Sequence, residues 1–136
     1  MIQAAEAQAL AAQAAGDTAG ALAAMEEATA LEDSISALSQ PPYPIIPAHE
    51  LYGMMLLKLH RPADARRHFE ETLRRTPGRP KAVYGIAGAA EVLGDRETAS
   101  ERYTELLALW KRADHNRPEL IAARRFLART SASTMR

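Results

Sequence analysis

The chain has 136 residues, of which 47% are hydrophobic and 25% are charged, and these proportions fit one soluble domain with a continuous core. It contains no cysteine, which excludes disulfide bonds, thiolate metal sites and cysteine nucleophiles. Its 17 basic and 17 acidic residues cancel, but residues 1–40 hold six acidic residues and no lysine or arginine. This asymmetry indicates either two solvated surfaces of opposite sign, which is the simpler interpretation, or an electrostatic contact surface.

The composition also bears on secondary structure and location. Aromatic residues make up only 5% of the chain and alanine is abundant, which favours closely packed helices over sheets. The first residues, MIQAAEAQAL, lack the basic start and the apolar block of a signal peptide, and no stretch approaches the length of a membrane span. We therefore expect a single all-α domain over residues 1–136, cytoplasmic and without a membrane contact.

Residues 1–33 form the first predicted unit, a pair of helices. Gly16 and Asp17 interrupt the helical pattern about halfway, as turn-forming residues do between two helices. The following segment, residues 34–47, contains SQPPYPIIP, whose prolines favour an extended path and forbid a helix. We interpret it as a rigid connector. Its P-x-x-P pattern is a weaker indication of a recruitment motif, and the segment could also fold across a groove.

Two further helix pairs are predicted at residues 48–78 and 79–112. The first pair is interrupted by the sequence HRP and the second by GD, and the helices show one apolar stripe. The stripe repeats with a period of 34 residues, and in all but one of the six pairs, Leu56 and Ala90, large residues match large ones and small residues match small ones. The matched positions are Tyr52 and Ile86, Gly53 and Ala87, Leu56 and Ala90, Leu59 and Leu93, Ala65 and Ala99, and Phe69 and Tyr103. Residues 1–33 match this pattern weakly at an offset of 44 residues, mainly at small positions and at Met25.

A single closing helix is predicted over residues 117–128, with Pro118 in the first turn and the acidic Glu119 near the helix start, both typical of a helix beginning. Leu120, Ala123 and Leu127 continue the apolar stripe, so we expect this helix to lie over the last pair and cover it. The tail, residues 130–136, lacks such a stripe and is expected to fray.

A helix, a tight turn and a second helix repeated every 34 residues resemble the tetratricopeptide repeat (TPR). The resemblance implies about three TPR-like repeats and a C-terminal capping helix, stacked as a right-handed superhelical array of helix-turn-helix hairpins. Small residues such as Gly53 and Ala65 would let helices approach closely, and Phe69 and Tyr103 would fill the space between hairpins. The segments PAHELYG, RPADARRHFE and PELIAARRFL are, more narrowly, similar to the C-terminal part of long bacterial TPR proteins. Whether the chain is a fragment of a longer protein stays open.

Catalytic, metal and cofactor motifs are not found in the sequence. No two of the four histidines stand three or four residues apart, and HELYG has Gly53 where the zinc-protease motif needs its second histidine. GIAGAA, residues 85–90, does not match the dinucleotide-binding motif and follows no strand, so close helix packing is the simpler interpretation. No histidine and acid are placed to activate a serine. We expect a protein that is not an enzyme and that has no catalytic residue, cofactor or metal.

Nucleic-acid binding is not expected either. The chain has three arginine pairs, at residues 66–67, 74–75 and 124–125. Interleaved acidic residues dilute these pairs, stacking aromatics are few, and the isoelectric point near 6.9 does not favour a phosphate-binding face. A solvated outer helix face is the simpler interpretation of the arginines.

In the TPR family the first helix of each hairpin lines a concave face where peptides or partner helices dock, and the resemblance implies the same role here. The partner-binding residues expected from the second and third hairpins are Glu50, Met54, Leu57, Lys58, Lys81, Tyr84 and Glu91. The expected face is completed by Gly88 of the third hairpin and by Gln3, Glu6, Leu10 and Gln13 of the first. Its apolar residues would supply contact area, and its lysines could meet a carboxylate. The leading hypothesis is a protein-protein interaction module for a protein or peptide whose identity stays open.

Two other interpretations are kept. The same residues could be the exposed side of a spacer. The chain could also be an assembly or scaffold segment that self-associates, or stacks in a longer solenoid, through its acidic and alanine-rich N-terminal hairpin, because an uncapped repeat tends to find a partner.

Overall fold

The computed structural model describes residues 2–34, 46–112 and 116–134, and over these residues the chain is all helical, with seven helices and no strand. The helices are α1 (Ile2–Ala14), α2 (Thr18–Ser34), α3 (Ala48–Lys58), α4 (Pro62–Arg75), α5 (Pro80–Leu93), α6 (Arg96–Leu109) and α7 (Pro118–Thr134). None of the described helices is both long and apolar enough to cross a membrane.

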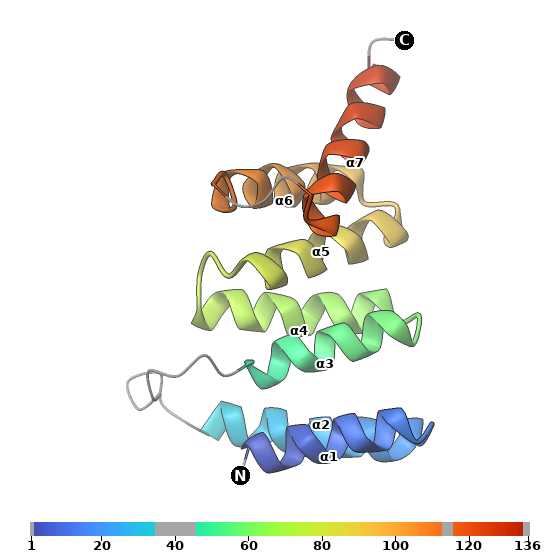
Figure 1. The fold of residues 1–136 in the computed structure, drawn as a ribbon, viewed down its shortest axis with the longest axis vertical. Helices are drawn as coiled ribbons and strands as arrows, with labels where there is room; N and C mark the ends of the chain where they lie inside the picture. Colours follow the sequence, from blue (N-terminus) through green and yellow to red (C-terminus); the bar gives the residue numbers. More distant parts are fainter. Residues whose placement is uncertain (1, 35–45, 113–115, 135–136) are drawn as a thin grey trace.

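Neighbouring helices pack in pairs, which form three hairpins: the first (α1 and α2), the second (α3 and α4) and the third (α5 and α6). Figure 1 shows them as successive layers along the long axis, with the first hairpin at one end and α7 at the other. Between layers, α3 contacts α1, α2 and α5, α4 contacts α5, and α6 contacts α7. The predicted all-α class and the predicted pairing of adjacent helices are confirmed.

The turns form where the sequence places glycine before aspartate. Gly94 ends α5 with a φ of 79°, a left-handed conformation that glycine adopts without steric cost. Asp95 then caps α6, since its carboxylate accepts a hydrogen bond from the backbone N–H of Thr98 at 3.2 Å. Gly16 and Asp17 repeat this arrangement between α1 and α2, and the HRP break lies between α3 and α4. Each predicted interruption is therefore a turn between paired helices.

The core between the second and third hairpins is built around Phe69 of α4, whose side chain is 1% exposed. Its ring lies against Gly53 of α3 and Gly85 of α5, where an added Cβ would stand 2.8 Å and 2.5 Å from ring atoms. Contacts this short do not occur between real carbon atoms, so both positions require glycine while the ring stays in place. The prediction that Phe69 fills the space between hairpins is confirmed, and Gly85 is a second glycine on which that packing depends.

The closing helix α7 covers the end of the third hairpin. Its Leu120 and Ala123 are buried, and Phe126 packs against Tyr103 of α6 with the ring centroids 5.1 Å apart. The predicted covering role of this helix is confirmed. Its predicted end is wrong, because α7 continues past residue 128 to Thr134 and so takes in part of the predicted tail.

The predicted apolar stripe is less buried at the end of each first helix. Leu59 follows the last residue of α3 and is half-buried, and Leu93 ends α5 and is 46% exposed. Both stand beside the turn of their hairpin, where the neighbouring helix no longer covers the stripe.

The proline-rich connector lies almost entirely outside the described residues. Ser34 ends α2 and Pro47 stands directly before α3, and residues 35–45 between them are not described. The interpretations of this segment as a spacer, a recruitment motif or a cover for the groove fall on those residues and stay predictions.

Candidate functional site

The face predicted to bind a partner is carried by α1, α3 and α5. Met54 and Leu57 of α3 are half-buried against the core of the first two hairpins, and Tyr84 of α5 is half-buried against the core beneath α7. Lys58 and Lys81 are exposed, and over the described residues neither ammonium group has an ion-pair partner. These five side chains keep the mixture of apolar area and free positive charge that the sequence predicts.

Glu50 does not lie on this surface, so its predicted place among the partner-binding residues is corrected. Its side chain is 0% exposed, and both carboxylate oxygens accept hydrogen bonds from Arg79, from Nε at 2.6 Å and from Nη2 at 2.9 Å. Arg79 stands directly before α5. A buried carboxylate needs such a partner, and the ion pair therefore joins the start of α3 to the start of α5.

Glu91 is exposed as predicted, but its carboxylate already holds other helices. Its oxygens accept hydrogen bonds from the hydroxyl of Tyr103 at 2.8 Å and from Nη2 of Arg129 at 3.4 Å, and so link α5 to α6 and α7. Burial, and the hydrogen bond to Glu91, raise the pKa of Tyr103 well above its usual range. Glu91 can meet a partner only in competition with these contacts.

The α1 part of the predicted face is divided. Gln3 and Leu10 are exposed, Gln13 and, on α5, Gly88 are half-buried. Glu6 is corrected, because it is buried with 8% of its surface exposed. Small neighbours allow this, since Ala5 and Ala9 of α1 belong to the core of the first two hairpins.

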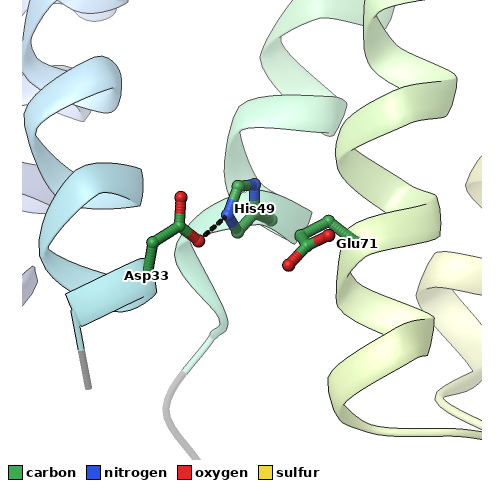
Figure 2. A group of neighbouring side chains, drawn as sticks. All are labelled: Asp33, His49 and Glu71. Carbon is green, nitrogen blue, oxygen red and sulfur yellow. Dashed lines mark hydrogen bonds and ion pairs between the residues drawn. The ribbon is translucent and has the colours of Figure 1, made fainter. Parts of the chain in front are cut away.

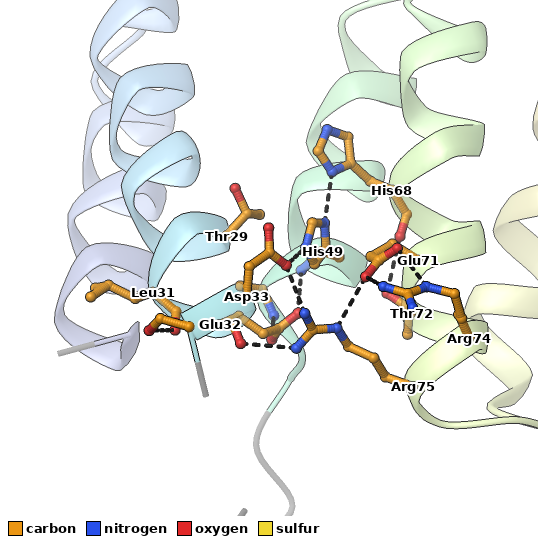
Figure 3. Close-up of polar contacts among 12 residues, drawn as sticks. Thr29, Leu31, Glu32, Asp33, His49, His68, Glu71, Thr72, Arg74 and Arg75 are labelled. Carbon is orange, nitrogen blue, oxygen red and sulfur yellow. Dashed lines mark hydrogen bonds and ion pairs between the residues drawn. The ribbon is translucent and has the colours of Figure 1, made fainter. Parts of the chain in front are cut away.

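A second group of polar side chains lies between the first two hairpins. We call it the inter-hairpin cluster, and its members are Asp33, His49, His68, Glu71 and Arg75 (Figure 3). His49 is buried, and its Nε2 lies 2.7 Å from Oδ1 of Asp33 while its Nδ1 lies 2.9 Å from Nδ1 of His68. Burial, with His49 as the next cause, lowers the pKa of His68, so His68 is neutral at pH 7.

Arg75 joins the last turns of α2 and α4. Its Nη2 donates to Oδ1 of Asp33 at 2.9 Å, its Nη1 to the backbone carbonyl of Glu32 at 2.9 Å, and its Nε to Oε1 of Glu71 at 3.1 Å. Glu71 also accepts from Arg74, and hydrogen bonds from the two arginines hold the pKa of Glu71 at about 2. The Glu71 carboxylate is therefore ionised at neutral pH and in moderately acidic solution.

Among the described residues, Asp33, His49 and Glu71 form a group that could hold a metal ion. Figure 2 shows them pointing toward one another from three helices, and one donor atom of each lies within 4.8 Å of the others. One nitrogen and two carboxylate oxygens would fit a transition metal such as zinc. However, the guanidinium of Arg75 already bonds both carboxylates, so a positive charge occupies the place that a metal would take. The geometry favours an ion-pair joint, beside an open depression of about 500 Å³.

The first and second hairpins are also joined by Glu32 and Glu26 of α2. The carboxylate of Glu32 accepts the backbone N–H of Ala48 at 2.6 Å and that of His49 at 3.3 Å, which satisfies two free amides at the start of α3. The hydroxyl of Tyr52 donates to Glu26 at 2.6 Å. The carboxylate acceptors come from the first hairpin and the hydrogen-bond donors from the second. Part of the negative charge of residues 1–40 therefore lies at the contact between the two hairpins.

Spacing within a single helix does not reveal the inter-hairpin cluster, because its members lie on three different helices. His49 and His68 stand on opposite helices of a hairpin that turns at residues 59–61, which brings them within about one helical turn of each other. Arg75 corresponds to Leu31 at the 44-residue offset between the first two hairpins, two residues before Asp33. The signal for the His49–His68 pair is therefore their placement on either side of one turn. The signal for the Arg75–Asp33 pair is their nearness once the two hairpins are aligned by the 44-residue offset.

No model of a known protein family matches the chain, and no curated protein matches it. The candidate sites therefore rest on the residues of this chain and their geometry.

Proposed function

We propose that the chain is a TPR-type interaction module, with about three repeats and a capping helix in a right-handed superhelical array, and that it binds a peptide or partner helix without catalysis. The observation that carries the proposal is that α3 and α5, which contact each other, both carry half-buried apolar side chains and a lysine without an ion pair to any described residue. These are Met54, Leu57 and Tyr84 with Lys58 and Lys81.

The balance of charge on this face supports a partner that carries carboxylates. The two acidic residues expected on α3 and α5 are already engaged, Glu50 by Arg79 and Glu91 by Tyr103 and Arg129. Lys58 and Lys81 have no ion-pair partner among the described residues. Half-buried apolar residues can bury further area at little entropic cost because the core already holds part of each side chain. Affinity would then come from the apolar residues, and orientation from Lys58 and Lys81.

The test is affinity capture from the source cell with the intact chain and with a variant in which Met54, Lys58, Lys81 and Tyr84 are alanine. The proposal expects a bound protein that the variant loses while its far-UV circular dichroism stays that of the intact chain. A control variant, Arg67→Ala, removes an exposed cation on α4, outside the proposed face, and should retain the protein. Equal capture by all three chains would reject this face as the binding site.

Self-association through the first hairpin is the alternative function, and one observation favours it. Leu10 of α1 is 47% exposed, and the alanines around it, Ala7, Ala11 and Ala14, are exposed as well. Such a surface would form an apolar contact that salt does not weaken, whereas a contact between exposed charges would be screened. Light scattering over a concentration and salt series should show an oligomer that Leu10→Glu dissociates. A monomer under all conditions would exclude this alternative.

A further inference from the structure

Glu6 is the one described charged residue of α1, and it is buried without a partner. Its side chain faces the interface with α2 and α3, 8% of its surface is exposed, and its Oε1 is fully buried and accepts no hydrogen bond from any described residue. Carboxylates in globular proteins are almost never buried in this way, because an ionised group loses the solvation that water would provide.

A neighbouring charge makes the position worse for an ionised Glu6. Burial raises the pKa of Glu6, and the negative charge of Glu32 on α2 raises it further. The two oxygens of Glu32 accept hydrogen bonds from the first backbone N–H groups of α3. Both oxygens are therefore engaged as acceptors, and Glu32 offers no hydrogen bond to Glu6.

Apart from Lys58 of α3, which is exposed and forms no hydrogen bond with Glu6, the charged groups that form bonds around this interface are committed elsewhere. On α3, His49 is bonded to Asp33 and His68, and Glu50 is held by Arg79. On α2, Glu26 accepts the hydroxyl of Tyr52. From α4, Arg75 reaches the backbone carbonyl of Glu32, and its remaining bonds go to Asp33 and Glu71. No described cation neutralises Glu6, so a proton is the ligand that fits its carboxylate.

We propose that Glu6 is a proton-binding site that controls how tightly the first hairpin docks on α3. In the docked chain Glu6 carries a proton, and a neutral carboxyl group can remain in the interface. When the proton leaves, a second negative charge stands beside Glu32 in a largely buried position. Release of the hairpin, which lets the ionised Glu6 reach solvent, is then favoured. Glu6 therefore makes the docking of α1 and α2 depend on pH.

The direction follows from the two protonation equilibria. Burial, with the charge of Glu32 as the second cause, raises the pKa of Glu6 from 4.5 to about 7 in the docked chain. In a released hairpin Glu6 is ionised above pH 4.5, whereas in the docked hairpin it keeps its proton up to about pH 7. Docking therefore weakens as the pH rises from 4.5 to about 7, and it changes no further above that range. These values give a docking equilibrium constant about 70-fold lower at pH 8 than at pH 5.

His68 makes stability depend on pH in the opposite direction, so its contribution has to be distinguished from that of Glu6. Its pKa is lowered in the folded chain, so its contribution to stability is complete above its unfolded pKa of 6.5 and is lost as pH falls below that value. The wild-type profile should therefore fall on both sides. The difference between wild type and Glu6→Gln cancels the His68 contribution, because glutamine keeps the shape of Glu6 and cannot ionise.

The experiment uses the full chain. Carbon-13 NMR of the glutamate side chains between pH 4 and 9 should show one carboxyl with a midpoint near 7 that is missing in Glu6→Gln. Hydrogen exchange of α1 and α2 should be slower in Glu6→Gln than in wild type at pH 8, by a factor that grows tens of fold from pH 5 to pH 8. Glu27→Gln, an exposed change of the same charge on α2, should leave the wild-type profile unchanged.

Two results would overturn the proposal. One is a Glu6 midpoint near 4.5, which would mean that its carboxyl is solvated in the docked chain. The other is an equal dependence of exchange on pH in wild type and Glu6→Gln, which would mean that another group controls docking.

Discussion

Phe69 is the side chain whose loss should damage the fold most. It is 1% exposed, and its ring is bordered by Gly53 and Gly85, which have no side chains that could move into the space left by the ring. Phe→Ala substitutions in cores cost about 3 to 5 kcal/mol, and poor collapse of the cavity places Phe69→Ala in the upper half of this range. Arg67→Ala on the same helix should cost less than about 1 kcal/mol, because Arg67 is 73% exposed and its ion pair with Asp64 is on the surface.

Gly85 allows a sharper form of the same experiment. Gly85→Ala should destabilise the wild type by about 1 to 3 kcal/mol through overpacking, less the roughly 1 kcal/mol that alanine gains over glycine in a helix. In the Phe69→Ala background the added methyl group enters the cavity, so the same substitution should be stabilising. Gly88→Ala provides the matched control on α5, since an added Cβ there meets nothing within 4 Å and should stabilise both backgrounds by up to about 1 kcal/mol.

Urea unfolding followed by far-UV circular dichroism measures all four single variants and the two doubles, with the midpoints compared at a common slope. The decisive quantity is the coupling energy between positions 69 and 85, which should exceed that between positions 69 and 88. Additive effects at 69 and 85, or equal effects of Gly85→Ala and Gly88→Ala, would refute the packing of the ring against Gly85.

Further changes test the polar contacts. Arg79→Met should lower the free energy of unfolding by about 3 to 5 kcal/mol because it leaves the buried Glu50 carboxylate without a partner. Adding Glu50→Gln should restore part of the loss. If Glu50 were exposed, Arg79→Met would be nearly neutral. Glu32→Ala should cost about 1 to 2 kcal/mol through loss of the cap on α3, and hydrogen exchange should then rise in the first turn of α3. Unchanged exchange there would show that water replaces the cap.

Much of the fold was predictable because its signals are local. The GD and HRP breaks lie at turns, and the small and aromatic positions around Phe69 lie in the core. The end of α7 was not predictable in the same way. Residues 129–134 contain neither glycine nor proline, so nothing in them stops a helix, and the lack of an apolar stripe does not decide between a solvent-exposed helix and a frayed tail.

The candidate site was harder to predict than the fold. Helical spacing predicted Met54, Leu57 and Tyr84 on a face off the buried stripe, where the structure has them half-buried, but it also placed the buried Glu6 and Glu50 on that face. Register fixes where a Cα lies and not where a long side chain ends. Glu50 is drawn inward by Arg79, which stands 29 residues further along and outside any helix, so no pattern within α3 could reveal the pair.

Most acidic residues of the first hairpin are used within the chain, and this limits how copies of the chain could associate. Of the six acidic residues in the first hairpin, Glu26, Glu32 and Asp33 accept hydrogen bonds from the second hairpin, and Glu6 is buried. Asp17 and Glu27 are exposed and take no part in these bonds, whereas Glu26 and Asp33 are exposed but already bonded to the second hairpin. Separated carboxylates in water attract a distant basic surface weakly, and salt screens that attraction. If copies of the chain associate through the first hairpin, the contact must therefore be mainly apolar, with charge already used to fix the hairpin to α3.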